Sequence, residues 1–153
     1  MSEAARPWLE LAMAHAGPTL QLATRLRKDL PAERARLVVQ QAELRRRAAE
    51  KFARADRMFF TPLGLEQSTD QWIAAYKAGR LAESSRSDGG WADLCCGIGG
   101  DLLAMAARGP VAGVERDPAT AVFAEANRAV CAEIHRGPNS GEVKVVDVAA
   151  FDV

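Results

Sequence analysis

The sequence predicts an α/β protein in which an N-terminal helical part precedes a small parallel β-sheet. Two patterns of apolar residues lead to this prediction. Up to about residue 83 the apolar residues recur at helical spacing. From residue 91 onward, short apolar runs alternate with helical runs in the order β-α-β-α-β, which is typical of parallel strands joined by helical crossovers. A length of 153 residues allows one ordinary domain or two small ones.

The helical part is expected to contain four helices, at residues 2–16, 19–28, 31–55 and 71–83. Gly17-Pro18 ends the first, and Pro31 suits the first turn of the third, where its missing N–H costs nothing. Residues 68–70 offer N-cap side chains to the fourth. The expected buried face of the third helix carries Leu37, Leu44, Ala48 and Phe52. The apolar residues of the fourth are Trp72, Ile73, Tyr76 and Leu81.

A polar linker at residues 84–90 marks the boundary between the two parts. We therefore expect a helical N-terminal domain at residues 1–85 and a partial sheet domain at residues 89–153. The expected strands and helices of the second part are 91–95, 100–108, 111–115, 118–135 and 142–147. Asp117 is expected to be an N-cap, because Pro118 follows it at the first helical position.

The stretch Asp-Leu-Cys-Cys-Gly-Ile-Gly-Gly-Asp, from Asp93 to Asp101, is typical of a loop that holds a nucleotide cofactor. An acid ends the first strand, glycines then let the backbone approach a ligand closely, and a helix start offers unpaired N–H groups. Glu115 ends the next strand, where a carboxylate can accept hydrogen bonds from two ribose hydroxyls. Together these features predict the cofactor half of a Rossmann-like domain.

The loop fits a dinucleotide motif poorly, because Cys95 stands where G-x-G-x-x-G needs its first glycine. It resembles instead the first motif of class I S-adenosylmethionine-dependent methyltransferases, an acid followed by three alternating glycines. The matching residues are Asp93, Cys95, Gly97 and Gly99, with Cys95 the one departure. The resemblance makes Glu115 the ribose ligand and Asp147 the acceptor for the adenine amino group. Val148 would give the adenine ring a backbone N–H.

Within that superfamily, the loop resembles RNA guanine methyltransferases of the trimethylguanosine-synthase type and bacterial relatives with a THUMP-like domain. The upstream segment from Lys51 to Thr69 is also similar to theirs. In such enzymes a segment before the first motif closes over the methionine end of the cofactor. The resemblance therefore nominates Phe60, Thr61, Gln67 and Thr69 as secondary cofactor contacts. The alternative is that they serve only in capping and core packing.

The catalytic motif of these enzymes, an Asp or Asn followed by Pro-Pro and an aromatic residue, does not occur in the chain, whose seven prolines are never adjacent. We therefore expect the chain to be the N-terminal and cofactor-binding portion of a methyltransferase, a fragment without methyl transfer of its own. The sheet edge beside the first strand is expected to be open and apolar, which favours self-association there.

Charge is divided unequally along the chain. Residues 1–88 hold 15 Lys and Arg against 11 Asp and Glu, whereas residues 89–153 hold 5 against 9. The expected third helix places Arg47, Lys51 and Arg54 on one face, which suits phosphate contacts with an RNA substrate. The alternative is a solvated face paired with Glu43 and Glu50.

Three cysteines fit neither a disulfide framework nor a metal site, and no apolar run approaches membrane length, so a cytoplasmic protein without a metal is expected. Two other functions stay open. One is the cofactor half of a dinucleotide-dependent oxidoreductase. The other is a non-enzymatic helical RNA-binding module joined to a vestigial Rossmann half.

Overall fold

A computed structural model describes residues 3–84, 90–134 and 143–147. Side chains are described for residues 4–84 and 90–130. The helical elements are η1 (Glu3–Ala5), α1 (Arg6–Ala14), α2 (Thr19–Leu26), α3 (Ala32–Ala48), α4 (Pro62–Gln67), α5 (Gln71–Ser84), α6 (Gly100–Ala106) and α7 (Pro118–Ile134). The strands are β1 (Trp91–Asp93), β2 (Val111–Glu115) and β3 (Val143–Asp147). The predicted order of helices and strands is confirmed, and α4 is an addition.

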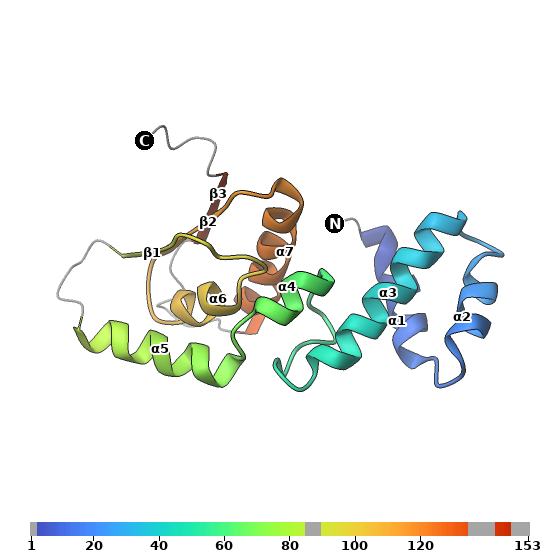
Figure 1. The fold of residues 1–153 in the computed structure, drawn as a ribbon, viewed down its shortest axis with the longest axis horizontal. Helices are drawn as coiled ribbons and strands as arrows, with labels where there is room; N and C mark the ends of the chain where they lie inside the picture. Colours follow the sequence, from blue (N-terminus) through green and yellow to red (C-terminus); the bar gives the residue numbers. More distant parts are fainter. Residues whose placement is uncertain (1–2, 85–89, 135–142, 148–153) are drawn as a thin grey trace.

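The first three helices form a small bundle at the end of the molecule away from the sheet (Figure 1). Both α1 and α2 pack against α3, and their shared core is Leu9, Ala12, Leu22, Leu26, Ala35, Val38, Val39 and Ala42. Of the residues predicted to be buried here, Leu44, Ala48 and Phe52 are buried, and Leu37 is not. Leu37 is 45% exposed, because the neighbouring Val38 and Val39 take the buried positions.

Helix α3 ends at Ala48, seven residues earlier than predicted, and the chain then turns back on the helix. Arg45 fixes this return. Its buried guanidinium donates to the carbonyl oxygens of Met58 (2.8 Å) and Arg57 (3.2 Å) and lies over the ring of Phe59. Burial lowers the pKa of Arg45, and the carbonyl contacts compensate for part of the lost hydration of its charge.

The next two helices lead from this return to the sheet. Thr61 caps α4 by accepting from the N–H of Gly64, and Asp70 caps α5 by accepting from the N–H groups of Trp72 and Ile73. Helix α5 packs on α6 through the small residues Ala74 and Ala78. Its large apolar residues Trp72, Ile73, Tyr76 and Leu81 are exposed instead, with Trp72 73% exposed.

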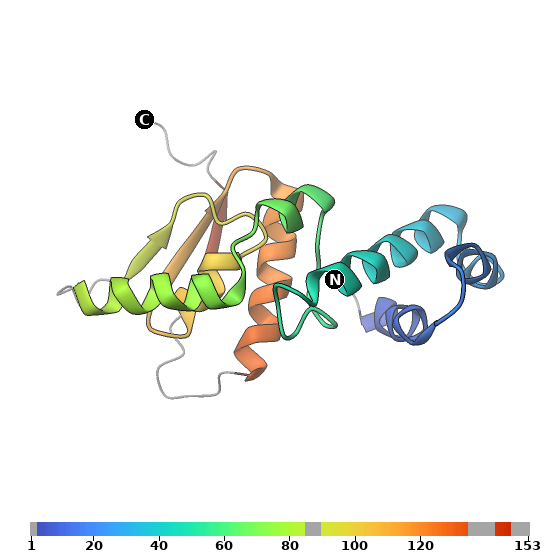
Figure 2. The same cartoon turned by 60° about the horizontal axis from the view of Figure 1, so that its bottom comes forward.

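The strands pair in parallel in the order β1-β2-β3, with Asp93 opposite Gly113 and Glu115 opposite Asp147. Both crossovers step in the same direction, so the right-handed rule places α6 and α7 on one face of the sheet. These helices contact each other and β2, and Figure 2 shows α5 running alongside α6. Asp117 caps α7 by accepting from the N–H of Thr120 at 2.9 Å, as predicted.

One apolar core joins the helical part to the sheet part. It unites Leu44, Ala48, Phe52, Met58, Phe60 and Leu65 with Ile98, Leu103 and Val130. Helix α5 likewise belongs to the core of the sheet part, because Ala78 packs with Leu102 and Val111. The division of the chain at residues 85–89 stays a prediction, and α5 packs with the second of the two parts. None of the helices described is long and apolar enough to cross a membrane.

Lys51 is expected to stabilise the fold through α4. Its ammonium donates to the carbonyl oxygens of Leu65 (2.9 Å), Glu66 (3.2 Å) and Ser68 (2.9 Å), at the C-terminal end of that helix. Lys51→Met keeps the aliphatic stem and removes these contacts, so the free energy of unfolding should fall by about 1–2 kcal/mol. Urea unfolding measures the change. Arg54→Met is the control, since Arg54 makes an exposed ion pair with Asp56 and its replacement should cost close to nothing.

Candidate functional site

A cavity of about 440 Å³ lies at the carboxyl ends of β1 and β2. Three segments surround it: the turn between β1 and α6, the start of the β2–α7 connection, and residues 61–69, which we call the strap. The lining residues are Thr61, Leu63, Gly64, Gln67, Ser68, Thr69, Asp93, Cys95, Cys96, Gly97, Gly100, Asp101, Glu115, Arg116, Asp117 and Thr120. This is the edge of a parallel sheet at which ligands of such folds bind.

The turn after β1 is shaped by glycine and tied to the neighbouring strand. Cys96 donates its backbone N–H to Val114 on β2 (3.0 Å), and Gly99 donates to Cys96 (2.8 Å). Gly97 has a φ of +54°, and nothing lies within 4 Å of the position a Cβ would occupy. A side chain at Gly97 would thus be strained by the backbone and would stand in open space, which is the expected property of a turn that a ligand approaches.

Glu115 connects the two loops of the cavity. One carboxylate oxygen accepts from the N–H of Gly97 (3.0 Å), and the other accepts from the N–H of Asp117 (2.8 Å). Each oxygen keeps lone-pair capacity for a further donor. The carboxylate is therefore held in a fixed position at the end of β2, where it can accept from the two hydroxyls of a ribose.

Asp93 is the least satisfied polar group of the cavity. Its Oδ2 is buried and has no hydrogen-bond partner within the described part of the chain. Burial raises the pKa of the Asp93 carboxyl, backbone N–H contacts from Cys95 and Leu102 oppose the rise, and the nearby Asp101 carboxylate adds to it. A buried acceptor without a donor costs free energy, so this oxygen is suited to a ligand that brings a donor or a positive charge.

Asp93→Asn is expected to stabilise the ligand-free protein in a pH-dependent way. A folded-state pKa above the unfolded value of about 3.9 means that this carboxyl favours folding in acid and loses that contribution as pH rises through the folded pKa. The asparagine does not titrate. Its advantage in free energy of unfolding should be small near pH 4 and should grow to a plateau at neutral pH.

Urea unfolding of both proteins between pH 4 and pH 8 checks this expectation. Asp29→Asn, at an exposed position, controls for the loss of one negative charge. A difference between Asp93→Asn and the parent protein that stays constant with pH would contradict it.

Three of the four predicted secondary contacts lie at the cavity, and all three belong to the strap. Thr61, Gln67 and Thr69 all line it. Phe60 does not: its ring is fully buried and packs on Phe52 with ring centroids 5.9 Å apart. The predicted cofactor contact of Phe60 is therefore wrong, and the alternative of core packing holds for this residue.

A cluster of polar groups that sequence reasoning missed lies beside Thr69. The Thr69 hydroxyl donates to Asp101 Oδ2 (2.8 Å), and the ammonium of Lys77, in the second turn of α5, contacts both oxygens of Asp101 at 3.0 and 2.8 Å. Lys77 also donates to Thr69 Oγ1 at 3.2 Å. The signal in the sequence was the acid that directly follows Gly99-Gly100.

The remaining predicted residues are placed as follows. Cys95 is exposed at the cavity, whereas Gly99 is buried behind the turn and does not line it. Asp147 ends β3 beside Glu115, so its backbone reaches the same sheet edge, and Val148 lies outside the described residues. Burial raises the pKa of the Cys96 thiol to about 12, which keeps this neighbour of Cys95 neutral.

Arg116, Asp117 and Thr120 also line the cavity without having been predicted to do so. The sequence could have indicated them, because they directly follow Glu115 at the end of β2 and lie at the start of α7. Hydrogen bonds from the Thr120 hydroxyl and N–H lower the pKa of Asp117, so this carboxyl is charged at neutral pH. In the described part of the chain, no three His, Cys, Asp or Glu side chains gather as metal ligands.

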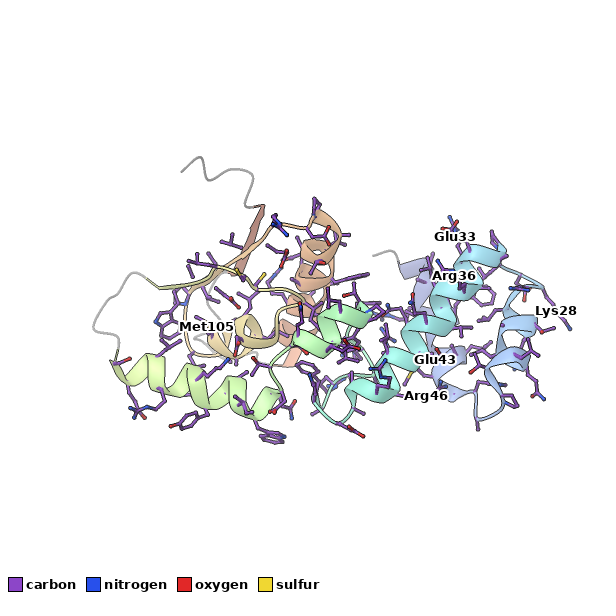
Figure 3. All side chains as sticks on the ribbon, in the orientation of Figure 1. Lys28, Glu33, Arg36, Glu43, Arg46 and Met105 are labelled. Carbon is purple, nitrogen blue, oxygen red and sulfur yellow. The ribbon has the colours of Figure 1, made fainter. Side chains whose placement is uncertain are left out.

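The basic residues of α3 do not form the predicted face. Since the helix ends at Ala48, Lys51 and Arg54 share no helix face with Arg47. Lys51 is bound to the strap, and Arg46 donates to the carbonyl oxygens of Ala12 (2.7 Å) and His15 (3.0 Å). Glu43 does not form the alternative ion pair with these cations either, because its carboxylate accepts a hydrogen bond from the Thr19 hydroxyl (3.1 Å). Figure 3 labels Glu43 and Arg46 on α3.

Of the comparisons with known proteins, the one with solved structures finds similarity. No protein-family model matches the chain, and no curated protein matches it. Among solved structures, it is similar to the crystal structure of a "putative methyltransferase from Porphyromonas gingivalis W83", with a TM-score of 0.69 and 23% sequence identity. The match covers 95% of this chain and 35% of that chain, so the protein described here spans about a third of the other's length. The chain therefore has the α/β fold of part of that protein.

Proposed function

We propose that the cavity binds S-adenosylmethionine and that the chain is the cofactor-binding portion of a methyltransferase. The observation that carries the proposal is the convergence of Asp93, Gly97 and Glu115 on one cavity at the carboxyl ends of β1 and β2. The loop motif that suggests this cofactor and the acid that would bind its ribose are 18 residues apart in sequence, and a hydrogen bond joins them.

The residues present fit this cofactor. Adenosylmethionine carries a ribose, an ammonium and a sulfonium, and it has no pyrophosphate. Glu115 would hold the ribose hydroxyls, and the unpartnered Asp93 oxygen would face the ammonium group of the amino acid end, directly or through water. When bound, the cofactor would supply an electrophilic methyl group. The chain's own residues orient it and, through the strap, cover one of its ends.

We further propose that the acceptor is RNA. Two observations support this proposal: the excess of Lys and Arg over Asp and Glu in residues 1–88, and the resemblance of the loop to RNA methyltransferases. The carbonyl contacts of Arg45, Arg46 and Lys51 leave fewer cations for phosphate than the sequence alone indicated. Self-association through β1, which lies at an edge of the described sheet, also stays a proposal.

Calorimetric titration of the 153-residue chain with S-adenosylmethionine and, in parallel, with NAD tests the cofactor. We expect binding of adenosylmethionine at a 1:1 ratio and no heat of binding with NAD. The opposite pattern would establish a dinucleotide site and refute the proposal. Binding of neither, in a protein shown to be folded by circular dichroism, would favour the non-enzymatic reading, which titration with a single-stranded RNA would then examine.

A further inference from the structure

We infer that the outward side of α5 is a contact surface for single-stranded RNA, an inference that rests on the RNA acceptor of the proposed function. The bases would stack on the rings of Trp72 and Tyr76, and the phosphates would lie on Arg80 and Arg108. This surface would take the place of the predicted basic face of α3, which the fold does not form because α3 ends at Ala48.

The aromatic part of the surface is largely in solvent. Trp72 is 73% exposed, Tyr76 69% and the neighbouring Ile73 54%. A spacing of four residues puts the two rings on the same side of the helix, about 6 Å apart along its axis. Large apolar side chains that gather at a surface mark a site of interaction. Because every nucleobase has a flat face, such rings suit stacking with unpaired bases.

Two arginines continue the surface toward the C-terminal end of α5. Arg80 follows Tyr76 at the same spacing of four residues, and its exposed ion pair with Glu83 is of a kind that contributes little to stability. Arg108, just after α6, is exposed, and its Nη2 lies 3.7 Å from the position that a Cβ would take at Gly79. Its guanidinium has no hydrogen bond or ion pair with the described residues. Both arginines can therefore take phosphate oxygens.

The surface begins beside the cavity. Thr69 lines the cavity, and Trp72 lies three residues further along the chain, in the first turn of α5. Figure 1 shows α5 running from the end of α4 away from the α1–α3 bundle. In an RNA strand that lies along α5, the nucleotide stacked on Trp72 would thus be the one nearest the strap and the proposed cofactor.

A second copy of the chain fits this surface less well. The apolar part consists of Trp72, Ile73 and Tyr76, and Arg80 adjoins it. A stable interface takes about 800 Å² from each partner, and an aromatic side chain supplies at most about 250 Å². Three side chains that are already partly covered supply well under the area required. The core of such an interface is also depleted of charged residues.

Fluorescence anisotropy with a fluorescein-labelled oligoadenylate of about 12 nucleotides tests the surface. Trp72→Ala and Tyr76→Ala should each raise the Kd about tenfold, the loss of one stacked base. Trp72→Phe keeps a ring and should bind nearly as well as the parent. Arg108→Met should reduce the slope of log Kd against log salt concentration by about 0.7, the value for one phosphate contact with a single strand.

Two variants in the α1–α3 bundle are matched controls. Leu20→Ala removes a side chain that is 77% exposed on α2, and Lys28→Met removes the exposed cation labelled in Figure 3. Both should leave the Kd and the salt slope unchanged. The variants at Trp72, Tyr76 and Arg108 should keep the parent's melting temperature and its affinity for S-adenosylmethionine, because these residues are exposed and do not line the cavity.

The outcomes separate the surface from the proposed function. If the parent chain does not bind the oligoadenylate at low salt, the surface fails together with the RNA acceptor, while the cofactor is decided by its own titration. If the parent binds it and both alanine variants bind equally well, only the surface on α5 is overturned. A parent dimer in analytical ultracentrifugation that Trp72→Ala dissociates, with RNA affinity unchanged, would assign this side of α5 to a second copy and also overturn the inference.

Discussion

Replacing Asn127 by leucine is expected to lower the free energy of unfolding by about 3 kcal/mol. Asn127 on α7 is fully buried, and its amide holds the helical part of the chain to the sheet part. Its Oδ1 accepts from the N–H of Phe59 (2.7 Å), and its Nδ2 donates to the carbonyl oxygens of Phe59 (3.0 Å) and Ile98 (2.9 Å). Leucine has a similar shape but would leave three backbone groups without partners.

Urea unfolding measures this loss. Val122→Ala is the matched control on α7, because that side chain is exposed and its removal should change the stability by less than about 0.5 kcal/mol. A loss below about 1 kcal/mol in Asn127→Leu would mean that water or a backbone shift satisfies the freed groups. The amide would then not be the joint between the two parts of the chain.

Replacing Glu115 by alanine is expected to weaken the binding of S-adenosylmethionine about 100-fold, which corresponds to the loss of two charge-assisted hydrogen bonds to the ribose. The same change frees the N–H groups of Gly97 and Asp117, so the turn after β1 also loses its link to the β2–α7 connection. Both effects act in the same direction on affinity.

Calorimetric Kd values for the parent, Glu115→Ala and Glu125→Gln check this expectation. Glu125 pairs with Arg128 on the surface of α7 and does not line the cavity, so its variant should bind normally. Near-ultraviolet circular dichroism of the ligand-free variants shows whether the fold persists. Undiminished binding by a folded Glu115→Ala protein would remove the ribose role from this residue.

Local sequence signals predicted the sheet part well. The bounds of β2 and the N-cap at Asp117 followed from an apolar run that ends in an acid and from an Asp-Pro pair before a helix. The turn between β1 and α6 followed from its glycines, because glycine adopts the positive φ angles found at Gly97 and Gly99 without steric cost. These features depend on neighbours within a few residues, which is why one sequence suffices to find them.

The helical part was predicted less accurately, because distant contacts decide it. Nothing at Ala48-Ala49-Glu50 disfavours a helix, yet α3 ends there. Lys51 binds the end of α4, and Phe52 enters the core that joins the two parts. These tertiary contacts override local propensity, and periodicity cannot reveal them.

Helix α5 buries small residues and exposes large ones, a choice that its own sequence does not reveal. Its small residues Ala74 and Ala78 form the buried face, since they let α6 approach closely, whereas Trp72 and Tyr76 lie exposed. Lys77 was missed for a related reason: its partner Asp101 is 24 residues away, and only the packing of α5 on α6 brings them together. A site assembled from several elements is visible in a single sequence only where a motif marks it.

The most direct measurement is a titration of the isotope-labelled chain with S-adenosylmethionine, followed by two-dimensional amide NMR. We expect the largest shifts at the backbone amides of Gly97, Asp117 and Thr120 around the cavity and at Thr69 on the strap, with the α1–α3 bundle unchanged. Shifts confined to the bundle, or none at millimolar ligand with the spectrum of a folded protein, would contradict a cofactor site in this cavity.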